Sequence, residues 1–110
     1  MPTTHLTIDN QLVACTTSPG DGLAALLIHG NSASGRTFQP QLESELGRTH
    51  RLIAIDLPGF GASQPIVDAE NGLGIQGYGR LVVKVVAALG LDDVVLVGWS
   101  LGGHVALEAA

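Results

Sequence analysis

Residues 94–103 read VVLVGWSLGG, and this stretch decides how the chain is expected to fold. Four apolar residues of strand character lead into a Gly-x-Ser-x-Gly pattern, and small residues of helical character follow. A sharp turn between a strand and a helix can hold a serine hydroxyl clear of the surrounding chain. The pattern therefore predicts that Ser100 is exposed on such a turn, where it is a candidate nucleophile.

The neighbours of Ser100 fit this chemistry. Gly98 and Gly102 flank it, at places where a side chain would collide with a neighbouring strand or helix. Ser100 would begin a helix whose free N–H groups favour negative charge, and the Leu101 N–H is a candidate oxyanion donor. Trp99 is a candidate substrate-binding residue, although packing behind the serine is the favoured role. The alternative is a glycine-rich turn with an incidental serine.

Two earlier segments have the character of strands that end in functional loops. Residues 23–28 (LAALLI) form an apolar run of strand length, and His29 and Gly30 follow it. In enzymes with a serine on such a turn, the loop after this strand supplies a second oxyanion donor. By position we assign this donor to the Asn31 N–H. A further strand ends at Asp56, and the turn-forming residues PGFG lead away from it at 58–61.

Together these segments resemble the α/β-hydrolase superfamily. The motifs are HGNSAS from residue 29, DLPGFGAS from residue 56 and GWSLGGH from residue 98, in the order and at the spacing of the family. Residues 29–43 and 98–104 look most like the α/β-hydrolase N-acyl homoserine lactone lactonases. Related esterases, perhydrolases and C–C bond hydrolases carry similar segments and stay open as alternatives. Epoxide hydrolases and haloalkane dehalogenases place Asp where this chain has Ser100.

The resemblance implies a serine hydrolase that acts on a small-molecule carboxylic ester or lactone. Ser100 would form an acyl-enzyme, with the Asn31 and Leu101 N–H groups as the oxyanion hole. The resemblance implies no cofactor and no metal. In the family the catalytic acid and histidine follow the serine, and this sequence ends ten residues after Ser100. We therefore expect the 110-residue chain to be inactive alone; a non-catalytic fragment or a ligand-binding homologue is the alternative.

Catalytic partners within the chain are poor candidates. His104 follows Ser100 by about one helical turn, but it is expected to project from the body of the helix and to be structural. His29 is expected to bond the backbone of its own loop. Asp56 could serve as an acid because it ends a strand at the same edge, but anchoring the turn at Pro58 is the favoured role.

Composition excludes several function classes. Ten acidic residues against five Lys and Arg give a net charge of −5 without a basic stripe, so nucleic-acid binding is not expected. The sequence has no signal-peptide pattern and no apolar run long enough to span a membrane, which predicts a cytoplasmic location without a membrane partner. The single cysteine, Cys15, is expected to be a small buried apolar residue. Charged residues make up only 14% of the chain, which indicates surface meant to be covered by further chain.

The expected fold class is α/β. Residues 1–110 would form the N-terminal portion of a single α/β-hydrolase domain, an incomplete version of that fold that ends in the helix after the serine. An antiparallel hairpin is expected at 5–8 and 11–16, followed by parallel strands at 23–28, 51–55 and 94–98 with crossover helices at about 36–47 and 75–89. Strand 94–98 should be buried on both faces because it is continuously apolar.

The family resemblance implies the strand order 1-2-4-3-5, counted along the chain. This order leaves strand 94–98 at the edge of the sheet within these 110 residues. An uncharged, valine-rich edge invites pairing with another chain. We therefore expect the 110-residue chain alone to associate with itself through this strand, to aggregate or to be partly disordered.

Overall fold

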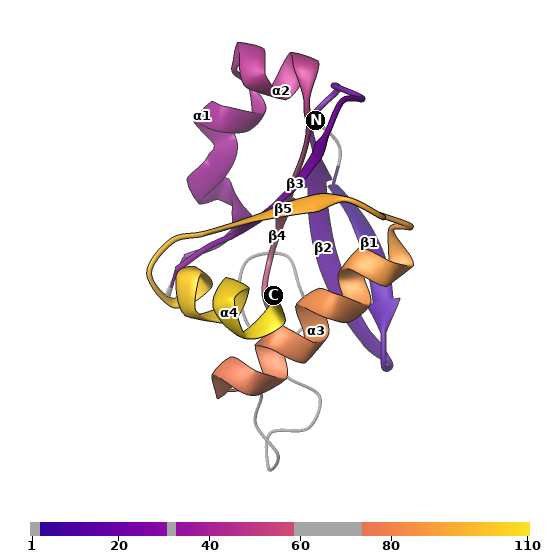
Figure 1. The fold of residues 1–110 in the computed structure, drawn as a ribbon, viewed down its shortest axis with the longest axis vertical. Coiled ribbons are helices and arrows are strands. Elements are labelled where there is room, and N and C mark those ends of the chain that lie inside the picture. Colours follow the sequence, from indigo (N-terminus) through magenta and orange to yellow (C-terminus); the bar gives the residue numbers. More distant parts are fainter. Residues whose placement is uncertain (1–2, 31–32, 59–73) are drawn as a thin grey trace.

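The chain alternates strands and helices, as the spacing of its apolar residues predicts. The structure is a computed structural model that describes residues 3–30, 33–58 and 74–110. In chain order the elements are β1 (Thr3–Ile8), β2 (Gln11–Thr17), β3 (Ala24–Ile28), the 3₁₀ helix η1 (Gly35–Phe38), α1 (Gln39–Leu42), α2 (Glu45–Thr49), β4 (Arg51–Ile55), α3 (Gly74–Ala88), β5 (Val94–Gly98) and α4 (Leu101–Ala109) (Figure 1). Of the helices described here, none has both the length and the apolar character that a membrane crossing needs.

The predicted hairpin joins β1 to β2. Asp9 and Asn10 form its turn with φ angles of 49° and 66°. Positive φ at both central residues matches the right-handed twist of the flanking strands, and Asp and Asn tolerate this conformation better than most residues. The first two strands are therefore joined by a tight turn that suits its sequence.

The five strands form one sheet in the predicted order, β1-β2-β4-β3-β5. β2 runs antiparallel to β1 and to β4, whereas β3 is parallel to both β4 and β5. The register places Ile28 beside Ile55 and beside Gly98. The three parallel strands therefore end at the same level, and the loops that leave them meet at one edge, where sites in α/β proteins are usually built. These findings confirm the predicted fold class.

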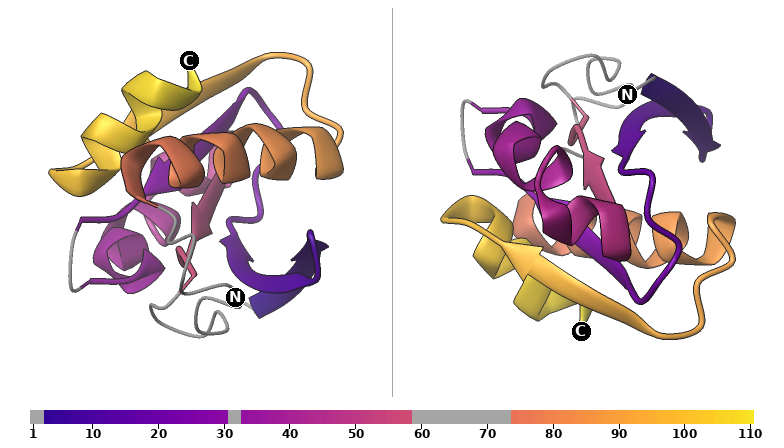
Figure 2. Two further views of the ribbon diagram at one scale, coloured as in Figure 1. Left: turned by 90° about the horizontal axis from the view of Figure 1, so that it is seen from below. Right: turned by 90° about the horizontal axis from the view of Figure 1, so that it is seen from above.

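Helices cover both faces of the sheet (Figure 2). α3 and α4 pack against each other and cover one face, while η1 and α1 lie on the other. β3 contributes to both cores because alternate side chains point to opposite faces. The core under α3 and α4 includes Leu26, Ile28, Ile53, Ile55, Val82, Val85 and Val105, and the core under η1 and α1 comprises Leu27, Phe38, Leu42, Leu52 and Ala54.

The single helix expected over 36–47 is wrong. The structure divides this segment into η1, α1 and α2. Ser44 has an extended backbone, with φ −77° and ψ 174°, and its Oγ donates a hydrogen bond to the Gln41 carbonyl at 2.6 Å. Serine competes for backbone groups in this way and so interrupts helices. The break also brings Gly47 so close to the Leu42 carbonyl that a side chain at 47 would overlap it.

The expected burial of β5 on both faces is also wrong. Val95 and Val97 are 47% and 40% exposed, whereas Val94 and Leu96, on the face under α4, are partly buried. η1, α1 and α2 lie over β3 and β4, and β5 is the last strand of the sheet. The apolar sequence of β5 therefore leaves one face open within the described residues.

Candidate active site

The site begins with the turn between β5 and α4, which holds Ser100 in an unusual conformation. Ser100 has φ 57° and ψ −119°, a region that residues other than glycine rarely occupy, and it is exposed. The backbone on either side is fixed by hydrogen bonds. The Trp99 N–H donates to the Ile28 carbonyl at 3.1 Å, and the Gly103 N–H donates to the Ser100 carbonyl at 2.9 Å. Such strain persists only where the surroundings enforce it.

The two flanking glycines allow this turn to fit against the sheet. A Cβ atom on Gly98 would overlap the Gly102 carbonyl, and one on Gly102 would overlap the Ile28 carbonyl. Both obstacles are backbone atoms, which have no rotamer that would relieve the overlap. Within this motif, glycine is therefore required by the closeness of strand β5, helix α4 and strand β3.

Of the two predicted oxyanion donors, only Leu101 lies within the described residues. Leu101 is the first residue of α4, and the opening N–H groups of a helix have no acceptor within the helix. Asn31 lies outside the described residues. Its neighbour Gly30 comes close to the serine, because a Cβ atom on Gly30 would lie 3.3 Å from the Ser100 Cβ and 3.2 Å from the Trp99 carbonyl. The loop after β3 therefore starts beside the candidate nucleophile.

Trp99 does not pack behind the serine, contrary to the favoured expectation. Its side chain is 60% exposed. Its ring comes near Gly30, where a Cβ atom would lie 3.8 Å from the Trp99 Cε3. A substrate-facing role for Trp99 stays a prediction.

His104 and His29 differ in burial and in their bonds. His104 is exposed on α4, and in the described part of the chain no hydrogen bond links its ring to the Ser100 hydroxyl. His29 is fully buried; its Nδ1 lies 2.7 Å from the Gly30 carbonyl and its Nε2 lies 3.0 Å from the Leu57 N. It therefore bonds loop backbone, as predicted.

Asp56 holds a segment that was not predicted, and its predicted anchoring of the turn at Pro58 stays a prediction. Its Oδ1 accepts a hydrogen bond from the Gly35 N–H at 2.6 Å, at the start of η1. Most of the turn that follows Pro58 lies outside the described residues. The link to Gly35 was missed from sequence because its donor is a backbone group 21 positions away.

Burial raises the pKa of two titratable groups near this edge of the sheet. It raises the pKa of the Cys15 thiol to about 11, and the negative charge of Asp56 raises it further. Cys15 is thus a buried thiol, as predicted, and is protonated at neutral pH. Burial also raises the pKa of Tyr78, whose hydroxyl donates to the Pro58 carbonyl at 3.0 Å. Neither group is placed to act on Ser100.

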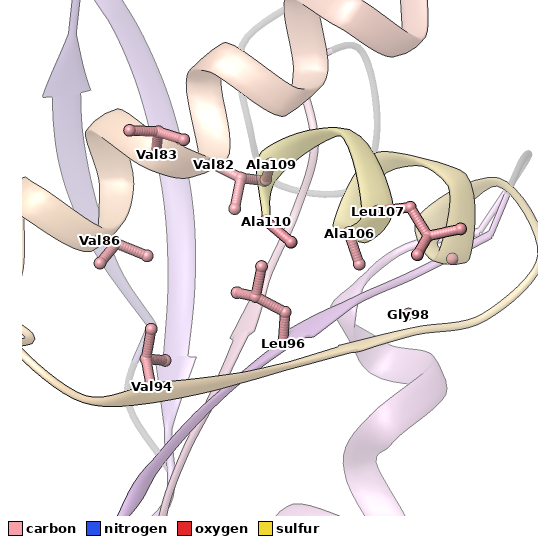
Figure 3. Close-up of a pocket in the computed structure, with 11 residues that line it drawn as sticks. Val82, Val83, Val86, Val94, Leu96, Gly98, Ala106, Leu107, Ala109 and Ala110 are labelled. Atoms are coloured by element: carbon pink, nitrogen blue, oxygen red, sulfur yellow. The ribbon is translucent and has the colours of Figure 1, made fainter.

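An apolar groove of about 700 Å³ lies between α3, α4 and β5 (Figure 3). Its lining residues carry no titratable side chain; they are Val82, Val83, Val86, Val94, Leu96, Gly98, Gly103, Ala106, Leu107, Ala109 and Ala110. Ser100 is not among them. The groove therefore offers contact area but no acid, base or nucleophile side chain, and it adjoins the serine turn at Gly98 and Gly103.

Known proteins are similar to this chain in fold and in sequence. A solved structure of the N-acyl homoserine lactonase AidH, complexed with N-butanoyl homoserine, has a TM-score of 0.94 and 41% sequence identity, over 99% of this chain and 40% of that one. The magnesium-chelatase 30 kDa subunit of Rhodobacter capsulatus is 35% identical over 94 residues, which are 86% of this chain and 32% of its own length.

The pimeloyl-[acyl-carrier protein] methyl ester esterase of Aliivibrio salmonicida is 36% identical over 91 residues, 83% of this chain and 31% of its own. The chain thus spans about a third of these two curated relatives. A family model described as the alpha/beta hydrolase family matches residues 25–110. With the serine turn, the mixed sheet and these similarities in agreement, the chain belongs to the alpha/beta hydrolase family.

Proposed function

We propose that this chain supplies the nucleophile of a serine hydrolase that cleaves a carboxylic ester or lactone, with N-acyl homoserine lactones as its substrate class. One observation carries the proposal: Ser100 is exposed in a strained backbone conformation at the start of α4. The 41% identity to the AidH lactonase, over nearly the whole chain, favours a lactone over other esters.

The proposed reaction has two steps. The Ser100 Oγ attacks the carbonyl carbon of the lactone and gives its proton to a histidine base. The resulting oxyanion is stabilised by the N–H groups of Leu101 and Asn31, and its collapse breaks the ring C–O bond, whose oxygen takes the proton back from the histidine. Water then hydrolyses the acyl-enzyme, which releases an N-acyl homoserine and restores Ser100.

The histidine base and its acid partner are proposed to come from outside these 110 residues. His29 is buried and bonds backbone groups of Gly30 and Leu57, and no hydrogen bond within the described residues joins the His104 ring to the Ser100 hydroxyl. Each oxyanion donor is worth about 10²–10³ in rate, whereas loss of the base costs on the order of 10⁶. We therefore expect the 110-residue chain by itself to be inactive.

Other functions are compatible with the same turn. An esterase is favoured by the similarity to the pimeloyl-[acyl-carrier protein] methyl ester esterase. Perhydrolase and C–C bond hydrolase activity use the same nucleophile and stay as alternatives. A non-catalytic or ligand-binding homologue would keep the fold without turnover.

Proton release by the full-length protein tests the proposal. The substrates are an activated ester and an N-acyl homoserine lactone, and the variants are Ser100→Ala and the control Ser44→Ala, which removes a serine from the α1–α2 break. We expect turnover of the lactone that Ser100→Ala abolishes and Ser44→Ala keeps. Turnover of the ester alone would indicate an esterase. Turnover that survives Ser100→Ala would contradict the nucleophile assignment, and an inert wild type would favour the non-catalytic alternative.

The same assay on the 110-residue chain tests where the base comes from. We expect no release, because the exposed ring of His104 makes no hydrogen bond to the Ser100 hydroxyl within the described residues. Release that depends on Ser100 would mean that the chain or its oligomer supplies a base, and His104→Ala would then identify it.

A further inference from the structure

Three consecutive residues after β4 each bond a different segment of the chain. The Asp56 carboxylate accepts from the Gly35 N–H at 2.6 Å. The Leu57 N–H donates to the His29 ring at 3.0 Å, and the Pro58 carbonyl accepts from the Tyr78 hydroxyl at 3.0 Å. Residues 56–58, which we call the β4 junction, therefore connect the loop after β3, the helix η1 and the helix α3.

The bonds of His29 fix one form of its ring. Its Nε2 faces the Leu57 N–H and must accept, because a backbone N–H can only donate. Its Nδ1 then carries the hydrogen and donates to the Gly30 carbonyl at 2.7 Å. The ring is fully buried. The ring thus joins the end of β3 to the β4 junction.

The β4 junction holds both ends of the loop that starts beside the nucleophile. Gly30 opens this loop and Gly35 closes it, and each is tied to the junction, through His29 and Asp56 respectively. Gly30 also packs against the serine turn, since a Cβ atom there would lie 3.2 Å from the Trp99 carbonyl. A shift of the junction relative to β3 would therefore change the distance between this loop and Ser100.

We propose that His29 is a positioning residue, which sets the loop after β3 at the correct distance from the Ser100 turn by its bond to Leu57. This inference rests on the proposed hydrolase function. His29 is fully buried and acts through Gly30, which lies against the Ser100 turn. The bond to Leu57 spans 28 positions and sets the placement of the loop, whereas the bond to Gly30 is local.

Two substitutions of His29 test the two bonds one at a time, because each keeps a different one. The amide of His29→Gln reaches as far as Nε2 and can accept from the Leu57 N–H, whereas the shorter amide of His29→Asn reaches only the position of Nδ1 and keeps the local bond to Gly30. Positioning errors of about 1 Å can cost on the order of 10²-fold in rate. We expect His29→Asn to lower kcat by one to two orders of magnitude, about 10- to 100-fold, with little change in KM. His29→Gln should restore most of kcat.

Ser18→Ala is the matched control. Ser18 is also buried and also bonds two backbone groups, because its Oγ accepts from the Leu52 N–H and donates to the His50 carbonyl, both at 2.9 Å. These bonds lie at the opposite end of β4 from the junction. We expect Ser18→Ala to lower Tm as His29→Asn does and to leave kcat unchanged. An equal loss of kcat in the two variants, or a wild-type kcat in His29→Asn, would overturn the positioning role.

An NMR readout keeps this inference separate from the proposed function. We expect the Leu101 amide resonance of the full-length protein to shift in His29→Asn but to stay near its wild-type position in His29→Gln and Ser18→Ala. If the wild type hydrolyses neither substrate, the proposed function fails and the Leu101 resonance still decides the structural claim. An unchanged Leu101 resonance in His29→Asn would contradict it.

Discussion

At the scale of single residues, the serine turn depends on the absence of a Cβ atom from its glycines. Ser100 carries backbone strain of about 1–3 kcal/mol, which the surrounding contacts must offset. Gly98 and Gly102 make those contacts possible because the Gly102 and Ile28 carbonyls occupy the places of their missing Cβ atoms. The neighbouring Gly103 differs: a Cβ there would lie 3.6 Å from the Gly98 carbonyl, an ordinary contact.

Two alanine substitutions test this difference. Gly102→Ala should lower the free energy of unfolding by about 1–3 kcal/mol or more, because the added methyl group displaces the Ile28 backbone. Gly103→Ala should leave it unchanged or raise it by up to about 1 kcal/mol, because alanine favours a helix. Urea denaturation of the full-length protein measures both. Equal effects of the two substitutions would contradict the assignment of the steric requirement to position 102.

The buried Cys15 thiol predicts a dependence of stability on pH. Burial, with a smaller effect of the Asp56 charge, raises its pKa from the ordinary value of 9.0 to about 11 in the folded chain. The unfolded chain therefore loses the thiol proton first, and the contribution to stability, present in full below pH 9, is lost as the pH rises toward 11. The expected loss is on the order of 2 kcal/mol.

Urea denaturation of wild type and Cys15→Ala between pH 8 and pH 11 measures this contribution. The difference in unfolding free energy between the two proteins should shrink as the pH rises. Parallel pH curves for the two proteins would show that the thiol titrates alike in the folded and unfolded chains.

At the scale of elements, the sequence predicts the strands well because local and long-range preferences agree, whereas their order in the sheet was implied by the family resemblance. The turn at Asp9 and Asn10 and the apolar runs at β3, β4 and β5 each fit the sheet that forms. The segment 36–47 could not be predicted in this way. Its apolar spacing favours one helix, but the hydrogen bond from Ser44 to Gln41 and the packing of Gly47 against Leu42 depend on the exact path of the backbone.

Prediction of the site from the sequence has the same limit. Ser100 and its glycines are recognisable because a local pattern encodes their turn. The bonds that Asp56 accepts from Gly35 and that His29 accepts from Leu57 are not recognisable, because the donor is in each case a distant backbone N–H, which every residue type but proline provides. The exposure of Val95 and Trp99 escaped prediction for another reason: it depends on which elements cover β5, and not on β5 itself.

At the scale of the whole molecule, the open side of β5 predicts self-association of the 110-residue chain. β5 is the last strand of the sheet, is uncharged, and exposes Val95 and Val97 on one face. A second copy would pair its own β5 antiparallel to the first, because one two-fold axis then satisfies both edges. The two pairs of exposed valines would meet on one face of the joined sheet.

Gel filtration over a range of concentrations tests this association. We expect an assembly larger than the monomer that Val95→Lys weakens, because lysine on an edge strand opposes pairing. The matched control is Leu46→Lys, which puts the same charge in place of a residue that is 50% exposed on α2. A monomer at all concentrations, or equal effects of the two substitutions, would contradict association through β5.

The serine turn also has a consequence for how its sequence can vary. The atoms that hold it are mostly main-chain atoms: the Ile28 carbonyl accepts from the Trp99 N–H and lies against Gly102. Substitution changes side chains and leaves carbonyl groups in place. In a library selected only for an intact turn, position 28 would accept many apolar residues and position 99 almost any, while positions 98 and 102 would return as glycine. The most variable and the most restricted positions would then stand side by side.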